Sequence, residues 1–184
     1  MEKPRIQPLS LPLNREIQDT MNKIFPKGLP SPGLYRTIAR NEGLFKDMVE
    51  RGFIGPTGLF DRRTMPRSLR ELIILRTCVA SKNDYEFNLH VETISQTMGL
   101  TSAQIEDISR EQPDKSLWKS SELDVMRLID ALVEIIEVND EIYEAVRRHF
   151  DESTLIEITN IIGLYTGVAM IVALAKPVFD NYKK

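Results

Sequence analysis

The chain has 184 residues, the length of a single domain, and 42% of them are hydrophobic. Its 24 Lys and Arg against 27 Asp and Glu leave a formal charge of −3, so no nucleic-acid partner is expected, because such binding depends on concentrated positive charge. The single cysteine, Cys78, excludes an intrachain disulfide and a cysteine-based zinc site. It indicates a reducing compartment, and we expect a cytoplasmic protein.

Helical patterns run through the chain, and no convincing alternating strand is present. Three prolines predict an extended arm over residues 1–13, followed by one all-α domain over residues 14–184. A segment rich in Gly and Pro at 52–67 predicts a loop. Helices are expected at 15–24, 32–51, 68–81, 83–98, 101–110, 121–138, 140–150 and 153–179.

The helix expected at 68–81 is apolar on almost every side, which predicts a central, buried position. Ser68, with Glu71 three residues later, fits a capping box at the start of this helix.

The most apolar stretch runs from Ile161 to Ala175, and its length falls short of the roughly 20 residues that span a bilayer. The N-terminal sequence also lacks the apolar region of a signal peptide, so we expect no membrane partner. Gly163 and Gly167 form a GxxxG pattern, which lets two helices approach closely. In a soluble chain this pattern indicates tight packing in the core or at a subunit interface.

Polar residues that can do chemistry concentrate between Glu71 and His90. Asn83, Glu86 and His90 follow at offsets 0, +3 and +7 and share one helical face. Glu86 and His90 can touch, and a carboxylate beside an imidazole raises the imidazole pKa and fixes its tautomer. This is a common general acid/base arrangement, which Glu71 could join and to which Tyr85 could add a hydroxyl.

The same residues also have a purely structural interpretation. Asn83 is a good N-cap, and Glu86 can reach back to the backbone N–H of Asn83. Glu71 can do the same for Ser68, and His90 can be a hydrogen-bonded core histidine. Spacing alone favours this structural interpretation.

Other patterns indicate no cofactor and no metal. His90 and His149 are far apart, and neither a zinc-protease motif nor a glycine-rich nucleotide motif occurs. Arg76, inside the apolar helix, either neutralises a buried acid or binds a substrate carboxylate.

Two segments, Leu69–Ala80 and the run Asn83-Asp-Tyr-Glu-Phe-Asn-Leu-His90, resemble the carboxymuconolactone decarboxylase family, which includes alkylhydroperoxidase D. The specific part of this resemblance covers about residues 66–110. It implies a compact all-α, alkylhydroperoxidase D-like bundle that forms a homo-oligomer. The apolar C-terminal helix and the N-terminal arm are the segments expected to contribute to assembly.

Residue by residue, Glu71 matches the family's buried Glu and His90 its His. Tyr85 and Glu86 match the Tyr-Glu of the family pattern Cys-x-Tyr-Glu-Trp-x-x-His. The peroxidase-type members of the family carry two cysteines where Asn83 and Glu86 stand here. With both thiols replaced, thiol peroxidase chemistry by the family's route is not expected.

The resemblance implies a cofactor-independent acid/base enzyme, a decarboxylase or other lyase acting on a small organic acid or lactone. His90 is the expected proton donor or shuttle, and Glu86 and Glu71 are expected to orient and tune it. Tyr85 is expected to hydrogen-bond a developing oxyanion.

Arg76 and Asn83 are the expected substrate contacts. The alternative is a non-catalytic oligomeric binding or stress-response protein, in which His90 lies buried without access to a cavity. Peroxidase activity through Cys78 is a less favoured reading, because cysteines in the middle of apolar helices are usually inert.

Overall fold

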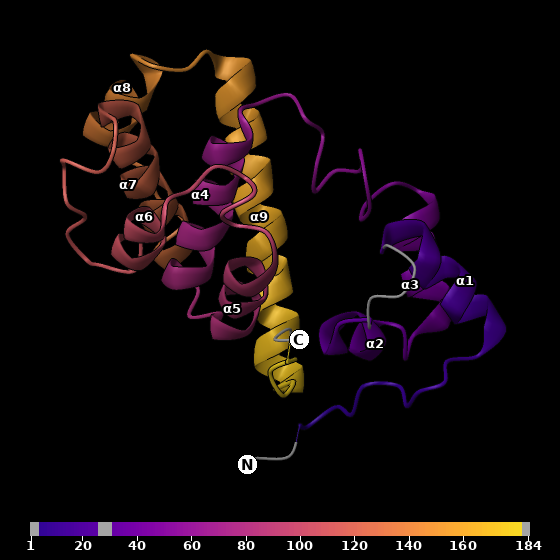
Figure 1. Cartoon of the computed structure of the whole chain (residues 1–184). Helices are drawn as coiled ribbons and strands as arrows, with labels where there is room; N and C mark the ends of the chain where they lie inside the picture. The colour runs from indigo at the N-terminus through magenta and orange to yellow at the C-terminus, as the bar shows by residue number, and fades with distance from the viewer. Residues whose placement is uncertain (1–3, 26–30, 182–184) are drawn as a thin grey trace. The chain divides into compact units, whose positions relative to one another are not determined.

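The computed structural model describes residues 4–25 and 31–181, and these residues form helices and connecting segments without any strand (Figure 1). The all-α class predicted from the sequence is confirmed. The helices are α1 (Arg15–Ile24), α2 (Gly33–Ile38), α3 (Glu42–Glu50), α4 (Arg67–Ala80), α5 (Asp84–Thr93), α6 (Ser102–Asp107), α7 (Ser120–Glu134), α8 (Asp140–Arg147) and α9 (Glu152–Ala175).

Contacts divide the chain into two compact units. The first takes the described residues up to Thr64 together with Ile171–Asn181, and the second is Met65–Met170. The single domain predicted for residues 14–184 stays a prediction.

The first unit has its own apolar core, formed by Ile17, Met21, Ala39, Phe45 and Ile54. Leu9 and Leu13, from the non-helical N-terminal segment, pack against this core.

One helix was expected over residues 32–51, but the structure has two, α2 and α3. The break falls at Asn41, whose side-chain oxygen accepts a hydrogen bond from the Leu44 N–H at 3.1 Å and so begins α3. An asparagine that caps a helix favours a new helix start over continuation of the previous one.

The second unit is built around α4, which packs against α7 and α5. Its apolar residues Leu72, Ile73, Ile74 and Leu75 are each 1% exposed or less. The predicted central position of this helix is therefore confirmed, and burial of this much apolar surface is the main force that holds the unit together.

The capping box predicted at Ser68 is wrong. α4 begins one residue earlier, after Pro66, and its N-cap makes no side-chain hydrogen bond. Glu71 instead lies fully buried, with a hydrogen bond to another helix.

Helix α5 ends at Thr93 rather than continuing to Met98. Turns follow to Gly99, which has a φ of 103°, a value that glycine adopts more readily than other residues. Because α5 ends at Thr93, Ser95 lies in the turn that follows, and its side chain is buried there.

Helix α9 has 24 residues and, by length and composition alone, is long and apolar enough to cross a membrane. The apolar stretch from Ile161 to Ala175 is shorter than the helix, because it does not include the first turns of α9. A core helix of a soluble protein meets the same criteria. In α9, 33% of the most apolar stretch is buried, and Ile158, Ile161 and Ile162 are each 4% exposed or less.

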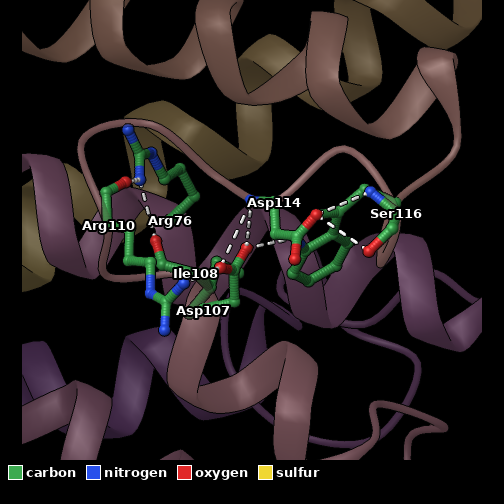
Figure 2. A network of polar contacts seen from close by, with 7 residues as sticks. Arg76, Asp107, Ile108, Arg110, Asp114 and Ser116 are labelled. Carbon is green, nitrogen blue, oxygen red and sulfur yellow. Dashed lines mark hydrogen bonds and ion pairs between the residues drawn. The ribbon is translucent and has the colours of Figure 1, made fainter.

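A polar network fastens α4 to its surroundings in the second unit. Arg76 donates two hydrogen bonds to the carboxylate of Asp130 on α7, at 2.7 and 2.6 Å. It also donates to the carbonyls of Ile108 and Arg110, both at 2.8 Å (Figure 2). A bidentate Arg–carboxylate pair of this kind fixes geometry as well as charge.

We expect Arg76→Met to lower the free energy of unfolding by about 2–3 kcal/mol, because it leaves Asp130 and two carbonyls without their donor. The matched control is Arg127→Met, which removes an ion pair to the 76% exposed Glu141 and a longer one, at 3.8 Å, to the 17% exposed Asp124, from an arginine that is itself 47% exposed. That change should cost less than about 1 kcal/mol. Urea unfolding measures both, and equal losses in the two variants would contradict this account.

Candidate functional site

A buried ion pair joins α4 to α5. His90 Nδ1 lies 2.9 Å from Glu71 Oε1, and the two side chains are 5% and 0% exposed. Ser95 Oγ donates to the same Glu71 oxygen at 2.7 Å. Since Glu71 Oε1 accepts from His90, Nδ1 of the imidazole carries a proton.

Glu86 approaches the other side of the imidazole. Its Oε1 is 3.6 Å from His90 Nε2, close enough for an ion pair but longer than a hydrogen bond. The side-chain oxygen of Asn83 accepts from the Glu86 N–H at 3.2 Å and caps α5, as one of the two sequence interpretations predicts. Imidazole, two carboxylates and an amide therefore share one buried cluster, which we call the Glu71–His90–Glu86 cluster.

The pKa of His90 shows how the cluster is charged. Burial by itself lowers this pKa, but the hydrogen bond and negative charge of Glu71, followed by the close contact and negative charge of Glu86, outweigh burial and raise it from 6.5 to about 9. His90 is therefore an imidazolium at neutral pH.

The carboxyl of Glu71 responds in the opposite sense. Burial raises its pKa, and the hydrogen bond and charge of His90, the Ser95 hydroxyl and the charge of Arg70 together bring the pKa below its ordinary value. Glu71 therefore remains ionised at neutral pH and supplies the charge that holds His90 protonated.

Two neighbours of His90 were missed by the sequence analysis. The ring of Tyr165, on α9, meets the imidazole edge to face at a centroid distance of 5.7 Å. Ser95 joins the site by its bond to Glu71, and Tyr165 by its contact with His90. Neither carries a sequence signal, because both contacts depend on how the helices pack.

The predicted site residues separate into two groups. Glu71, Asn83, Glu86 and His90 lie together. Arg76 instead bonds Asp130 and the backbone carbonyls of Ile108 and Arg110, which Figure 2 shows.

Tyr85 is 4% exposed on α5, beside Glu86 in sequence. A substrate contact for Arg76 and an oxyanion contact for Tyr85 stay predictions. In the part of the chain that the structure describes, no group of three or more His, Cys, Asp or Glu side chains is arranged to hold a metal ion.

Cys78 also lies in α4, 1% exposed. Burial, together with the negative charges of Glu86 and Glu71, raises the pKa of its thiol well above the ordinary value. The thiol is therefore neutral at physiological pH, the opposite of what a reactive cysteine requires.

Neither a family model nor a curated protein matches the sequence. Solved structures do match. The apo debrominase Bmp8 gives a TM-score of 0.77 at 15% identity, covering 96% of this chain and 92% of the other. A cysteine-to-alanine variant of that enzyme in complex with 2,3,4-tribromopyrrole gives 0.70 at 16% identity, covering 98% and 93%.

A peroxidase-related protein from Silicibacter sp. TM1040, itself uncharacterised, gives a TM-score of 0.76 at 16% identity, covering 98% of this chain and 95% of the other. At such identities the likeness shows the fold alone. The chain therefore has the all-helical, alkylhydroperoxidase D-like fold that the resemblance implied.

We expect the His90 imidazole to titrate near pH 9, and Glu71→Gln to lower that midpoint by one unit or more, because it removes the charge that holds the proton. The stability that the raised pKa contributes is complete below about pH 6.5 and is lost as the pH rises through 9. Imidazole NMR signals measure the midpoint, and the chain has only two histidines to assign.

The control for this titration is Glu92→Gln, at an exposed position on the same helix, which should leave the midpoint unchanged. A native midpoint at or below 6.5 would contradict the ion-pair assignment.

Proposed function

We propose that this protein is a cofactor-independent acid/base enzyme acting on a small molecule. The observation that carries the proposal is a buried imidazole held between two carboxylates, Glu71 at 2.9 Å and Glu86 at 3.6 Å, which raise its pKa. Perturbed titratable groups gathered in one place are typical of catalytic sites.

The geometry supports distinct roles for the three side chains. Glu71 accepts the hydrogen bond from His90 Nδ1–H and fixes the orientation of the ring. The proton on Nε2 is therefore the one that His90 can donate to a substrate. With a pKa of about 9, His90 enters the reaction as an acid and not as a base. Glu86, opposite Nε2, is placed to return the proton or to accept one from substrate.

The reaction class that the family resemblance favours is a decarboxylase or other lyase acting on an organic acid or lactone. Loss of CO₂ leaves carbanion character that must be protonated, and a buried imidazolium is a suitable donor. The Bmp8 complex with tribromopyrrole supports a small-molecule role, because that protein with the same fold binds a compact ring compound.

Two other functions remain as alternatives, a thiol peroxidase and a non-catalytic binding protein. Thiol peroxidase chemistry requires an accessible thiolate, and Cys78 is buried with a raised pKa and has no second cysteine. A non-catalytic binding role is favoured by one observation, the 4% exposure of His90. An enzyme with this site must open to admit its substrate.

Screening purified protein against small lactones and keto acids tests the proposal. We expect turnover of at least one compound, reduced at least about 100-fold by His90→Gln, since a positioned acid contributes typically 10²–10⁴-fold to rate. His149→Gln, which removes the other histidine, should leave turnover unchanged. Turnover that survives His90→Gln sinks the proton-donor role, and no turnover at all favours the binding protein.

We further propose that α9 joins two copies of the chain. Ile156, Gly163 and Met170 recur every seven residues and so lie on one face of α9. Ile156 is 72% exposed and Met170 68%, and a Cβ built on Gly163 or on Gly167 would meet no atom within 4 Å. Large apolar side chains flanking open glycines suit the close approach of a second helix.

Light scattering tests this assembly. We expect the native chain to be oligomeric. The double variant Ile156→Glu with Met170→Glu should have the mass of a monomer, because like charges would repel each other across the contact between the two α9 helices. Ile135→Glu, at a 67% exposed apolar position outside α9, is the matched control and should keep the native mass. A monomeric native chain contradicts the proposal.

A further inference from the structure

Three buried polar atoms in the Glu71–His90–Glu86 cluster have no protein partner. Among the described residues, the buried side-chain nitrogen and oxygen atoms without a hydrogen bond are Glu71 Oε2, Asn83 Nδ2 and Glu86 Oε2. The three residues are each 3% exposed or less. Folded proteins seldom leave buried polar atoms unpaired, so three in one cluster point to a ligand.

Each of the three side chains has one polar atom committed to the protein and one left over. Glu71 Oε1 accepts from His90 and Ser95, which leaves Oε2. Asn83 Oδ1 caps α5, which orients the amide and leaves Nδ2. Glu86 Oε1 faces the imidazolium, which leaves the second oxygen. The committed atoms fix the three side chains, so each free atom is held in place before a ligand binds.

The three free atoms define the chemistry of a ligand group that could bind them. It offers two acceptors, which are carboxylate oxygens, and one N–H₂ donor. A primary carboxamide or a urea matches these atoms, because it carries N–H donors next to one carbonyl acceptor. A ligand carboxylate brings no donor and places its charge against two carboxylates, and a ketone or ester brings only an acceptor.

We propose that the cluster binds its small-molecule ligand through a primary carboxamide or ureido group. The carbonyl of that group accepts from Asn83 Nδ2, and its N–H bonds donate to Glu86 Oε2 and Glu71 Oε2. The inference rests on the proposed function in that the cluster is a small-molecule site, and it names the group that this site recognises. The part of the substrate that meets Glu86 is neutral, not an acid anion.

Three probes of almost equal size test the selectivity: acetamide, acetate and acetone. Each is titrated into ¹⁵N-labelled protein while the backbone amides of Asn83 and Glu86 and the imidazole of His90 are followed by NMR. We expect acetamide to shift these signals with an affinity at least about tenfold above those of acetate and acetone, since leaving buried polar partners unpaired costs that much. Equal affinities, a preference for acetate, or unmoved signals with all three probes would overturn the proposal.

Two nearly isosteric variants assign the preference to atoms. Asn83→Asp keeps the capping oxygen and removes the N–H donor, and Glu86→Gln turns an acceptor into a donor. Each should reduce acetamide affinity about tenfold. Asn139→Asp, the same change at the N-cap of α8, where the side chain accepts from Ile142 N–H at 2.9 Å, is the matched control and should change nothing.

Thermal unfolding checks that each variant is folded, and Asn83→Ser replaces Asn83→Asp if the added charge disrupts the cluster. A carboxamide preference that survives in the Asn83 and Glu86 variants overturns the assignment.

Binding and turnover separate this inference from the function it rests on. If acetamide is preferred but no lactone or keto acid is turned over, including those that carry a carboxamide group, the recognition stands and the acid/base proposal fails. If turnover depends on His90 but acetamide has no advantage over acetate, the acid/base proposal stands and the recognition fails.

Discussion

The hydrogen-bonded ion pair between Glu71 and His90 is the constraint on which the rest of the second unit depends. A carboxylate with 0% exposure is costly to bury, and it is tolerated because an imidazolium and a hydroxyl meet it. The pair fixes α5 against α4, sets the proton on His90, and directs the other face of the ring toward Glu86. Without the charge of Glu71, His90 would lose the larger of the two carboxylate contributions that raise its pKa.

Asn83 and Glu86 stand where the peroxidase-type members of the family that the sequence resembles carry two cysteines. A helix N-terminus with a nearby His–Glu pair stabilises a thiolate where cysteines are present. Here Asn83 keeps the capping contact, and Glu86 adds a second carboxylate to the imidazole. This arrangement fits the proton transfer and the polar recognition that we propose. Cys78 does not restore the redox role, because its thiol sits inside an apolar helix with a raised pKa.

Arg76 and Glu71, both on α4, have different roles. Arg76 is saturated by Asp130 and by carbonyls after α6, so its charge fastens helices together. Glu71, Asn83 and Glu86 each keep one buried polar atom without a partner in the protein. Such atoms are available to a ligand, which is why the Glu71–His90–Glu86 cluster, and not the Arg76 network, is the candidate site.

The sequence by itself determined the all-α class, the buried position of α4, the N-cap at Asn83, and the shared face of Glu86 and His90. These follow from local periodicity and capping, which act over one or two helical turns. The capping box at Ser68, the single helix over 32–51 and the extension of α5 were wrong, because in each case a competing cap, turn or long-range bond decided the outcome.

Only the tertiary structure decided that Glu71 bonds His90 rather than its own helix end. It also decided that Ser95 and Tyr165 complete the surroundings of His90, and that Arg76 belongs to Asp130. Those choices depend on which helices pack together. Spacing along one helix places side chains on a face, but it holds no information about what that face meets.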